Sequence, residues 1–191
     1  MLFIVLLEVG EDGVYAYRVG GDVLRGRVVA VATADDIIKA SNLGYTFVAA
    51  KVFLPEAVEE AGKRGIRLVS IEEIAEPLSV LLVNLLANRR GDMLIRLFDQ
   101  LIPSFMTRTY YYYEYMDYNR GDVYATSFKA TVKVHERFYS EVFGDLVELL
   151  SELSMRMGKT RGVQVEFATR REANSHVVSL EFTVERPSKT Q

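Results

Sequence analysis

Acidic side chains next to predicted strands are the first candidates for chemistry. Asp35 and Asp36 directly follow a β-branched run, Lys51 ends the next predicted strand, and Asp22 lies in an earlier turn. Ligand sites in α/β folds lie at the carboxyl ends of such strands, which makes a metal or phosphoryl site one interpretation. The alternative needs no ligand, because one Asp can cap a helix and the other suits its first turn. We favour the alternative.

Tyrosine forms the most unusual segment of the sequence. Seven tyrosines fall within fifteen residues, at positions 110, 111, 112, 113, 115, 118 and 124. Strand alternation puts Tyr110 and Tyr112 on one face together with Arg108, and tyrosines 111, 113 and 115 on the other. The next predicted strand carries Lys129 and Lys133 on one of its faces. We therefore expect one tyrosine row in the core and the other on an open face near these lysines.

The open tyrosine row has three interpretations. Tyrosines can stack on bases while cations neutralise phosphate, as in sheet-based binders of single-stranded nucleic acid. Tyrosine is also enriched at interfaces between proteins. Finally, the row can reflect strand propensity and aromatic pairing alone. We rank the interface first, because the nearly neutral charge of this half argues against strong DNA affinity.

Composition excludes many enzyme classes. The chain has 191 residues, a net charge of −3, 49% hydrophobic residues, no Cys and two His. The absence of Cys excludes disulfides, thiolate zinc sites, cysteine nucleophiles and Cys-ligated iron–sulfur clusters. The apolar start, Met1–Leu7, lacks a basic region before it and reads as a buried strand, so we expect a cytoplasmic protein without a membrane partner. The scarcity of Asn, Gln and Cys is typical of thermophiles.

Residues 1–76 predict a small mixed-sheet α/β domain in the order β-β-β-α-β-α-β. The expected elements are strands at 3–9, 14–19, 27–33, 45–53 and 66–69, with helices from Asp35 or Asp36 to Asn42 and from Pro55 to Gly65. Proline suits the first turn of a helix and glycine its end. Strands separated by helices imply parallel pairing with right-handed crossovers.

Residues 77–186 predict an α+β domain in the order α-β-β-α-β-β, beginning at Pro77, with a frayed tail at 187–191. The expected elements are a helix over 78–102 interrupted at 88–92, strands at 105–117 and 122–134, an amphipathic helix over 138–157, and strands at 163–169 and 176–185. This order indicates a duplicated helix–hairpin unit, with four antiparallel strands and two helices on one face.

The stretch Leu78–Leu86 is apolar on nearly all sides. Such a helix is buried either in the core of its own chain or against another subunit. We therefore expect an oligomer, either a homo-oligomer such as a dimer or a hetero-oligomer.

The segment Phe47–Glu73 resembles the end of the Mrr-like restriction-endonuclease family. The match lies on Phe53, Pro55, Glu56, Ala57, Ala61, Gly65, Ile66, Leu68, Glu72 and Glu73. The resemblance implies a nuclease-like fold over about residues 22–73, with Mg²⁺ held by an Asp, at the position of Asp22, and by an acid paired with a Lys on the next strand. That strand reads Ala30–Thr33 and carries neither, so the resemblance implies a fold whose catalytic residues are lost.

These observations predict a non-catalytic, oligomeric binding or accessory protein without cofactors, linked to nucleic-acid processing through the nuclease-like segment. Arg108, Tyr110, Tyr112, Lys129 and Lys133 are the expected binding residues. One alternative is a small-molecule sensor with an apolar pocket in the C-terminal domain. A metal-dependent hydrolase using the three aspartates ranks last.

Overall fold

The computed structural model describes residues 4–102, 109–138 and 141–187, and the chain divides into two units. The first unit comprises Met1–Leu81 with Arg96–Ser104, and the second comprises Leu82–Ile95 with Phe105–Gln191. We expected a boundary at Pro77, but helix α3 (Ile71–Ala87) continues through this proline. The first division between the units therefore falls inside α3, at Leu81/Leu82. Residues 82–95 belong to the second unit, whereas residues 96–104 belong to the first.

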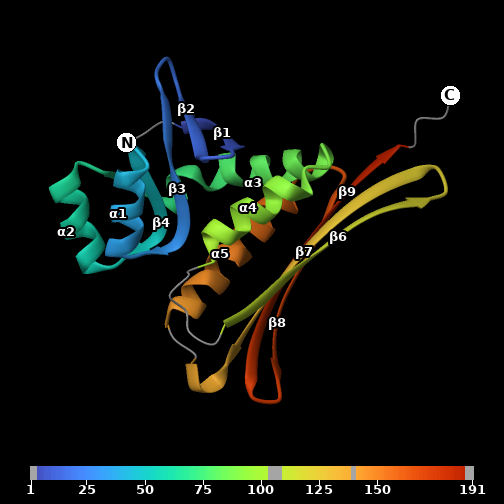
Figure 1. Cartoon of the computed structure of the whole chain (residues 1–191). Helices are drawn as coiled ribbons and strands as arrows, with labels where there is room; N and C mark the ends of the chain where they lie inside the picture. Colours follow the sequence, from blue (N-terminus) through green and yellow to red (C-terminus); the bar gives the residue numbers. More distant parts are fainter. Residues whose placement is uncertain (1–3, 103–108, 139–140, 188–191) are drawn as a thin grey trace. The chain divides into compact units, whose positions relative to one another are not determined.

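The N-terminal unit holds a five-stranded mixed sheet in the order β1-β2-β3-β4-β5 (Figure 1). Its elements are β1 (Ile4–Gly10), β2 (Gly13–Arg18), β3 (Val23–Ala32), α1 (Ala34–Asn42), β4 (Phe47–Phe53), α2 (Pro55–Arg64) and β5 (Arg67–Ser70). Strands β1, β2 and β3 pair antiparallel, whereas β3, β4 and β5 run parallel. This confirms the predicted order, although β3 begins four residues earlier than expected.

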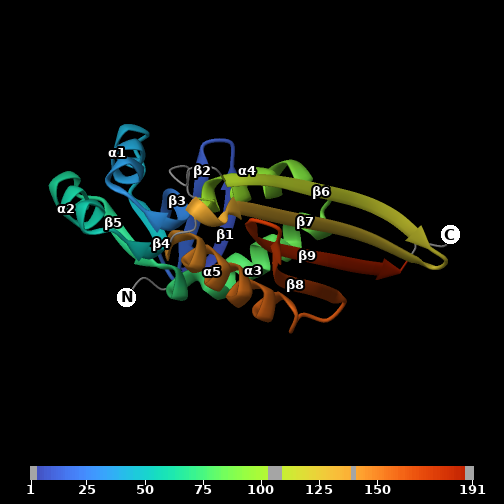
Figure 2. The ribbon, with the colours of Figure 1, turned by 90° about the horizontal axis from the view of Figure 1, so that it is seen from below.

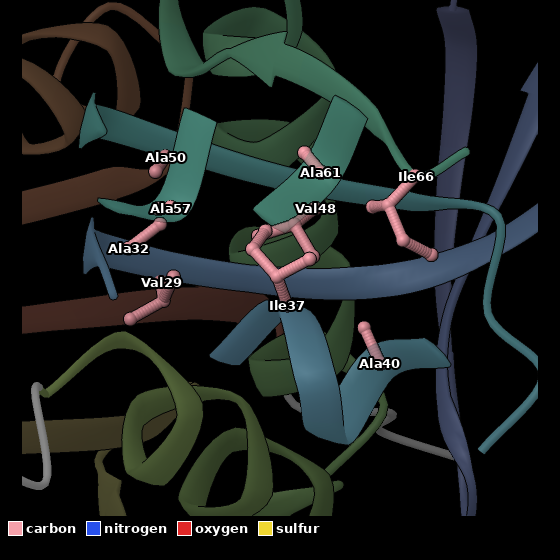
Figure 3. Close-up of a cluster of buried hydrophobic side chains, with 9 residues drawn as sticks. All are labelled: Val29, Ala32, Ile37, Ala40, Val48, Ala50, Ala57, Ala61 and Ile66. Atoms are coloured by element: carbon pink, nitrogen blue, oxygen red, sulfur yellow. The ribbon is translucent and has the colours of Figure 1, made fainter. Parts of the chain in front are cut away.

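Small buried side chains hold α1 and α2 against the parallel strands (Figure 3). Val29 of β3 and Val48 of β4 lie in one cluster with Ile37 of α1 and Ala57 of α2. Alanine lets the backbone of a helix approach the sheet closely, and burial of the apolar surface supplies the driving force. Helix α2 starts at Pro55 and stops at Gly65, whose φ of 67° is left-handed, as predicted from the two residue types.

The C-terminal unit holds a four-stranded antiparallel sheet in the order β6-β7-β9-β8 (Figure 2). Its elements are the end of α3, the start of α4 (Gly91–Leu101), β6 (Thr109–Arg120), β7 (Val123–His135), a 3-10 turn (Glu136–Phe138), α5 (Glu141–Met157), β8 (Val163–Glu172) and β9 (Ser175–Pro187). The predicted α-β-β-α-β-β order is confirmed. The turn of the first hairpin was misplaced, because it is Gly121–Asp122 rather than Tyr118–Gly121, so β6 continues three residues further than expected. The expected start of this strand, at 105–108, lies outside the described residues.

Helix α5 covers one face of this sheet at β8 and β9. Its buried side chains recur every three or four residues, at Phe143, Leu146, Leu149, Leu150, Leu153 and Met157. They pack toward the sheet face that carries Phe128 and Phe182, both fully buried. Burial of these aromatic rings provides the largest single contributions to the core of the unit.

Two further expectations concern helices. Leu78, Leu82 and Leu86 of α3 are buried within the single chain, so this apolar helix provides no argument for an oligomer. Over the described ranges, no helix combines the length and the apolar character needed to cross a bilayer.

Candidate binding surface

The register of β6 against β7 separates the tyrosines as predicted. Tyr110 lies opposite Lys133, Tyr112 opposite Thr131 and Glu114 opposite Lys129. Residues directly opposite each other in an antiparallel pair share a face of the sheet. We call this side, which points away from α5, the open face; no element of the described part of this unit covers it. Arg108, expected beside Tyr110, lies outside the described residues.

The other tyrosine row faces the same side as α5. The Tyr113 ring stacks on Phe128 with their centroids 5.6 Å apart, and Phe128 contacts Phe182 in turn. Tyr111 and Tyr115 remain 43% and 39% exposed, so the expectation that this whole row enters the core was wrong for these two. The reason is position: β6 is at the edge of the sheet, whereas α5 contacts β8 and β9.

Exposed apolar groups concentrate on β6. On the open face, 65% of Tyr110 and 59% of Met116 remain exposed, and the rings of Tyr110 and Tyr112 meet at a tilt with centroids 5.8 Å apart. On the opposite face, the α3–α4 turn lies against the strand, since a Cβ at Gly91 would be 2.9 Å from the Tyr115 ring. Aromatic side chains thus project from both faces of one strand.

Acidic residues lie next to the described cations of the open face. The ammonium group of Lys133 lies 3.0 Å from a carboxylate oxygen of Glu172, and Arg170 lies 2.7 Å from the other. These two donors, Arg170 first, hold the pKa of Glu172 below its usual value. Lys129 lies between Glu114 on β6 and Glu181 on β9, directly opposite both. Among the side chains described on this face, each of these three cations therefore has an acidic residue beside or opposite it.

Sequence reasoning missed the acidic side of this arrangement. Glu172 follows Arg170 and Arg171 in a charged run that we placed after the end of the strand, at Thr169. Strand β8 continues to Glu172, which puts this run into the sheet. The charged run itself was the available signal, because alternating signs in one strand allow pairing with neighbouring strands.

The four sheet edges found in the described ranges differ in how they are protected against pairing with another strand. Strand β1 has a register shift between Ile4 and Leu6, β5 is only four residues long, and β8 carries four charged residues among its last seven. Bulges, short strands and charges are the usual protections of sheet edges. Among the described residues β6 pairs only with β7, and its register is unbroken from Thr109 to Arg120 without Pro or Lys.

The acidic candidates do not form a common site. Thr33, not Asp35 or Asp36, caps α1: its hydroxyl accepts the amide N–H of Asp36, whose carboxylate accepts the amide N–H of Thr33 at 2.9 Å. Asp36 also lies 3.4 Å from Arg27. The first-turn role foreseen for an Asp is confirmed, but the cap was misassigned because Thr33 reads as part of the preceding strand.

The remaining candidates each have local partners. Asp35 pairs with Lys39 and Asp22 with Arg18, both at 3.6 Å across one turn of chain. Lys51 lies near Glu72, whose pKa is lowered first by the Ser70 hydroxyl and to a smaller degree by Lys51. In the part of the chain that the structure describes, no three acidic or histidine side chains gather as metal ligands would.

A hollow of about 230 Å³ lies between α5 and the β8–β9 hairpin. Phe143, Gly144 and Val147 of α5 line one side, and Thr169, Arg170, His176 and Val177 line the other. The sensor alternative expects an apolar pocket in this unit, and pockets for drug-sized ligands usually measure about 300–1,000 Å³. The hollow therefore gives that alternative little support.

No family model and no curated protein matches this chain. Among solved structures, it shows a weak similarity to the type 4 fimbrial biogenesis protein PilO from Pseudomonas aeruginosa. The two are 12% identical with a TM-score of 0.30, and the match covers 82% of this chain and 99% of that one. A similarity this weak does not indicate a shared function. The Mrr-like resemblance stays a prediction.

Proposed function

We propose that this chain is a non-catalytic binding protein whose C-terminal unit takes up another polypeptide as an added strand along β6. One observation carries the proposal: β6 is a long edge strand with exposed aromatic side chains, without the register shift of β1 or the shortness of β5, and less densely charged than the end of β8. An extended segment that pairs with such an edge gains main-chain hydrogen bonds, while neighbouring side chains supply specificity.

A polypeptide fits this surface better than a nucleic acid. Binding to nucleic acid depends on cations that are free to replace counterions on phosphate. Here Lys133 and Arg170 already share Glu172, and Lys129 lies between two glutamates. Tyr110 and Met116 are the exposed groups, and aromatic residues and Met are enriched in protein interfaces. An accessory role in nucleic-acid processing rests on the nuclease-like resemblance of residues 47–73.

A peptide selection tests the proposal. Random twelve-residue peptides displayed on phage are selected against the immobilised full chain, and the winners are measured by fluorescence anisotropy. A double variant, Tyr110→Lys with Met116→Lys, adds two charges to β6 where both side chains are exposed. We expect it to weaken binding of the selected peptides at least tenfold.

The matched control puts the same two charges on the other edge. Gln164→Lys with Ala168→Lys changes exposed positions on the open face of β8 and should bind the peptides like the wild type. Single-stranded DNA and RNA are titrated in parallel at two salt concentrations. Peptide binding that ignores the β6 lysines would overturn the proposal. So would tight oligonucleotide binding that is lost in Lys129→Ala with Lys133→Ala.

A further inference from the structure

The sequence of β6 indicates which strand can pair with its outer edge. We propose that this strand is β6 of a second copy, paired antiparallel about a two-fold axis at Tyr115, so that two four-stranded sheets become one. This inference rests on the proposed function and names the partner of the same edge. Symmetric pairs that use one patch twice are the commonest form of protein oligomer.

Symmetry restricts the possible registers. A two-fold axis normal to a continuous antiparallel sheet keeps both open faces on the same side. Residues opposite each other must then point to the same face, as they do between β6 and β7. Side chains alternate along a strand, so the axis must pass through a residue and not between two residues. Each candidate register is therefore named by the one residue that meets its own copy.

Length and charge select among these registers. Two of them pair the longest stretches of β6: an axis at Glu114 pairs residues 109–119, and an axis at Tyr115 pairs residues 110–120. The axis at Glu114 places two carboxylates directly opposite each other, which is unfavourable across a strand pair. An axis at Asp117 has the same defect and pairs fewer residues. Tyr115 is thus the axis at which the strand best matches itself.

With the axis at Tyr115, the other residues of β6 that come to lie opposite each other in the two copies are compatible. Glu114 falls opposite Met116 of the second copy, and Tyr112 falls opposite Tyr118, all on the open face. The second copy would cover Met116, which is 59% exposed in the single chain, and bring the two half-exposed Tyr115 rings together. Aromatic pairs directly across strands are among the favourable cross-strand contacts.

The absence of cysteine from the natural chain makes the register measurable. In a symmetric pair, only the residue on the axis meets its own copy. Single variants Tyr113→Cys, Glu114→Cys, Tyr115→Cys and Met116→Cys are oxidised, or treated with a short bismaleimide, at micromolar concentration. We expect Tyr115→Cys to form covalent dimers at least ten times faster than the other three. Fastest cross-linking at another position would overturn the Tyr115 axis.

Light scattering on the full chain tests the assembly itself. We expect twice the mass of the 21.6 kDa chain at micromolar concentration. We expect a single-chain mass for Met116→Glu, because this change would place a carboxylate directly opposite Glu114 of the other copy. The β8 control, Gln164→Glu, adds the same charge at an exposed position of the other edge and should stay dimeric, and circular dichroism checks that all variants fold. A dimer that persists in the β6 variant would overturn the inference.

The two proposals fail in different ways. A monomeric wild type whose β6 still binds selected peptides would refute the second copy and retain strand addition. A monomer that binds no peptide through β6 would refute both.

Discussion

Lys133 of β7 reaches across the intervening strand β9 to Glu172 of β8, with its ammonium nitrogen 3.0 Å from the carboxylate. The pair thus joins two strands that are not neighbours in the sheet. Because Arg170 contacts the same carboxylate, one acidic side chain pairs with two cations of the open face. Lys133, one of the two lysines that sequence reasoning offered to phosphate, is therefore already engaged in an ion pair.

The ion pairs of Glu172 with Lys133 and Arg170 predict a pH-dependent difference in stability between the wild type and Glu172→Gln. Its pKa is lower in the folded chain than its ordinary value of 4.5, because Arg170 and Lys133 donate to the carboxylate. The carboxylate therefore stabilises the fold above about pH 4.5, and this contribution is lost as the pH falls through the folded pKa. Glu172→Gln should lower the urea midpoint at pH 7 and match the wild type at low pH. Glu166→Gln, on the same face of β8, is the control. A difference that does not change with pH would contradict the assignment.

Gly26 is predicted to tolerate no side chain. A Cβ there would lie 2.4 Å from the carbonyl oxygen of Phe47 and 2.5 Å from its ring, where β3 and β4 pair. Gly26→Ala should therefore force the strands apart and cost about 3 kcal/mol or more. Gly62→Ala is the matched change, because it adds the same methyl to α2 with nothing within 4 Å. It should stabilise the chain by about 0.5–1 kcal/mol. Thermal denaturation of both variants measures the contrast, and equal effects would refute it.

Phe128 is predicted to be the main packing residue of the C-terminal sheet. It is fully buried and contacts the rings of Tyr113 and Phe182. Phe128→Ala should cost about 3–5 kcal/mol, the usual range for a buried aromatic ring. Tyr110→Ala removes an exposed ring from the neighbouring strand and should cost less than about 0.5 kcal/mol. Since a chain of two units need not unfold in one step, hydrogen exchange of β7 and β9 amides is the appropriate measurement. Similar exchange in both variants would count against this role.

The capping box of α1 predicts a smaller effect in the N-terminal unit. Thr33→Ala removes the hydroxyl that accepts the amide of Asp36 and should cost about 1 kcal/mol. Asp35→Asn changes an exposed carboxylate paired with Lys39 and should alter stability by less than about 0.5 kcal/mol. Chemical denaturation followed by hydrogen exchange in α1 separates the two. A larger loss from Asp35→Asn would point to a role beyond the ion pair with Lys39.

The face of the sheet on which each tyrosine lies could be predicted from sequence, because side chains alternate along any strand. Tyr110 and Tyr112 therefore share a face with Lys129 and Lys133, as expected. The link from Lys133 to Glu172 could not be predicted, since it depends on the strand order β7-β9-β8. The edge position of β6 depends on the same order. Thr33 was misassigned for another reason. As a β-branched residue directly after a β-branched run, it was taken as the last residue of the strand and not as the N-cap of α1.

The strand order also means that two of the strand pairs join residues close in sequence, whereas the third joins distant ones. Each hairpin closes over a short turn, whereas the central pair β7–β9 joins residues as far apart as Val123 and Pro187. Closing that larger loop costs chain entropy before the pairing repays it. We therefore expect the hairpins to form early and their union along β7 and β9 to limit the refolding rate. Until that step, the inner edges of both hairpins stay open to wrong partners, which makes dilute conditions favourable for refolding.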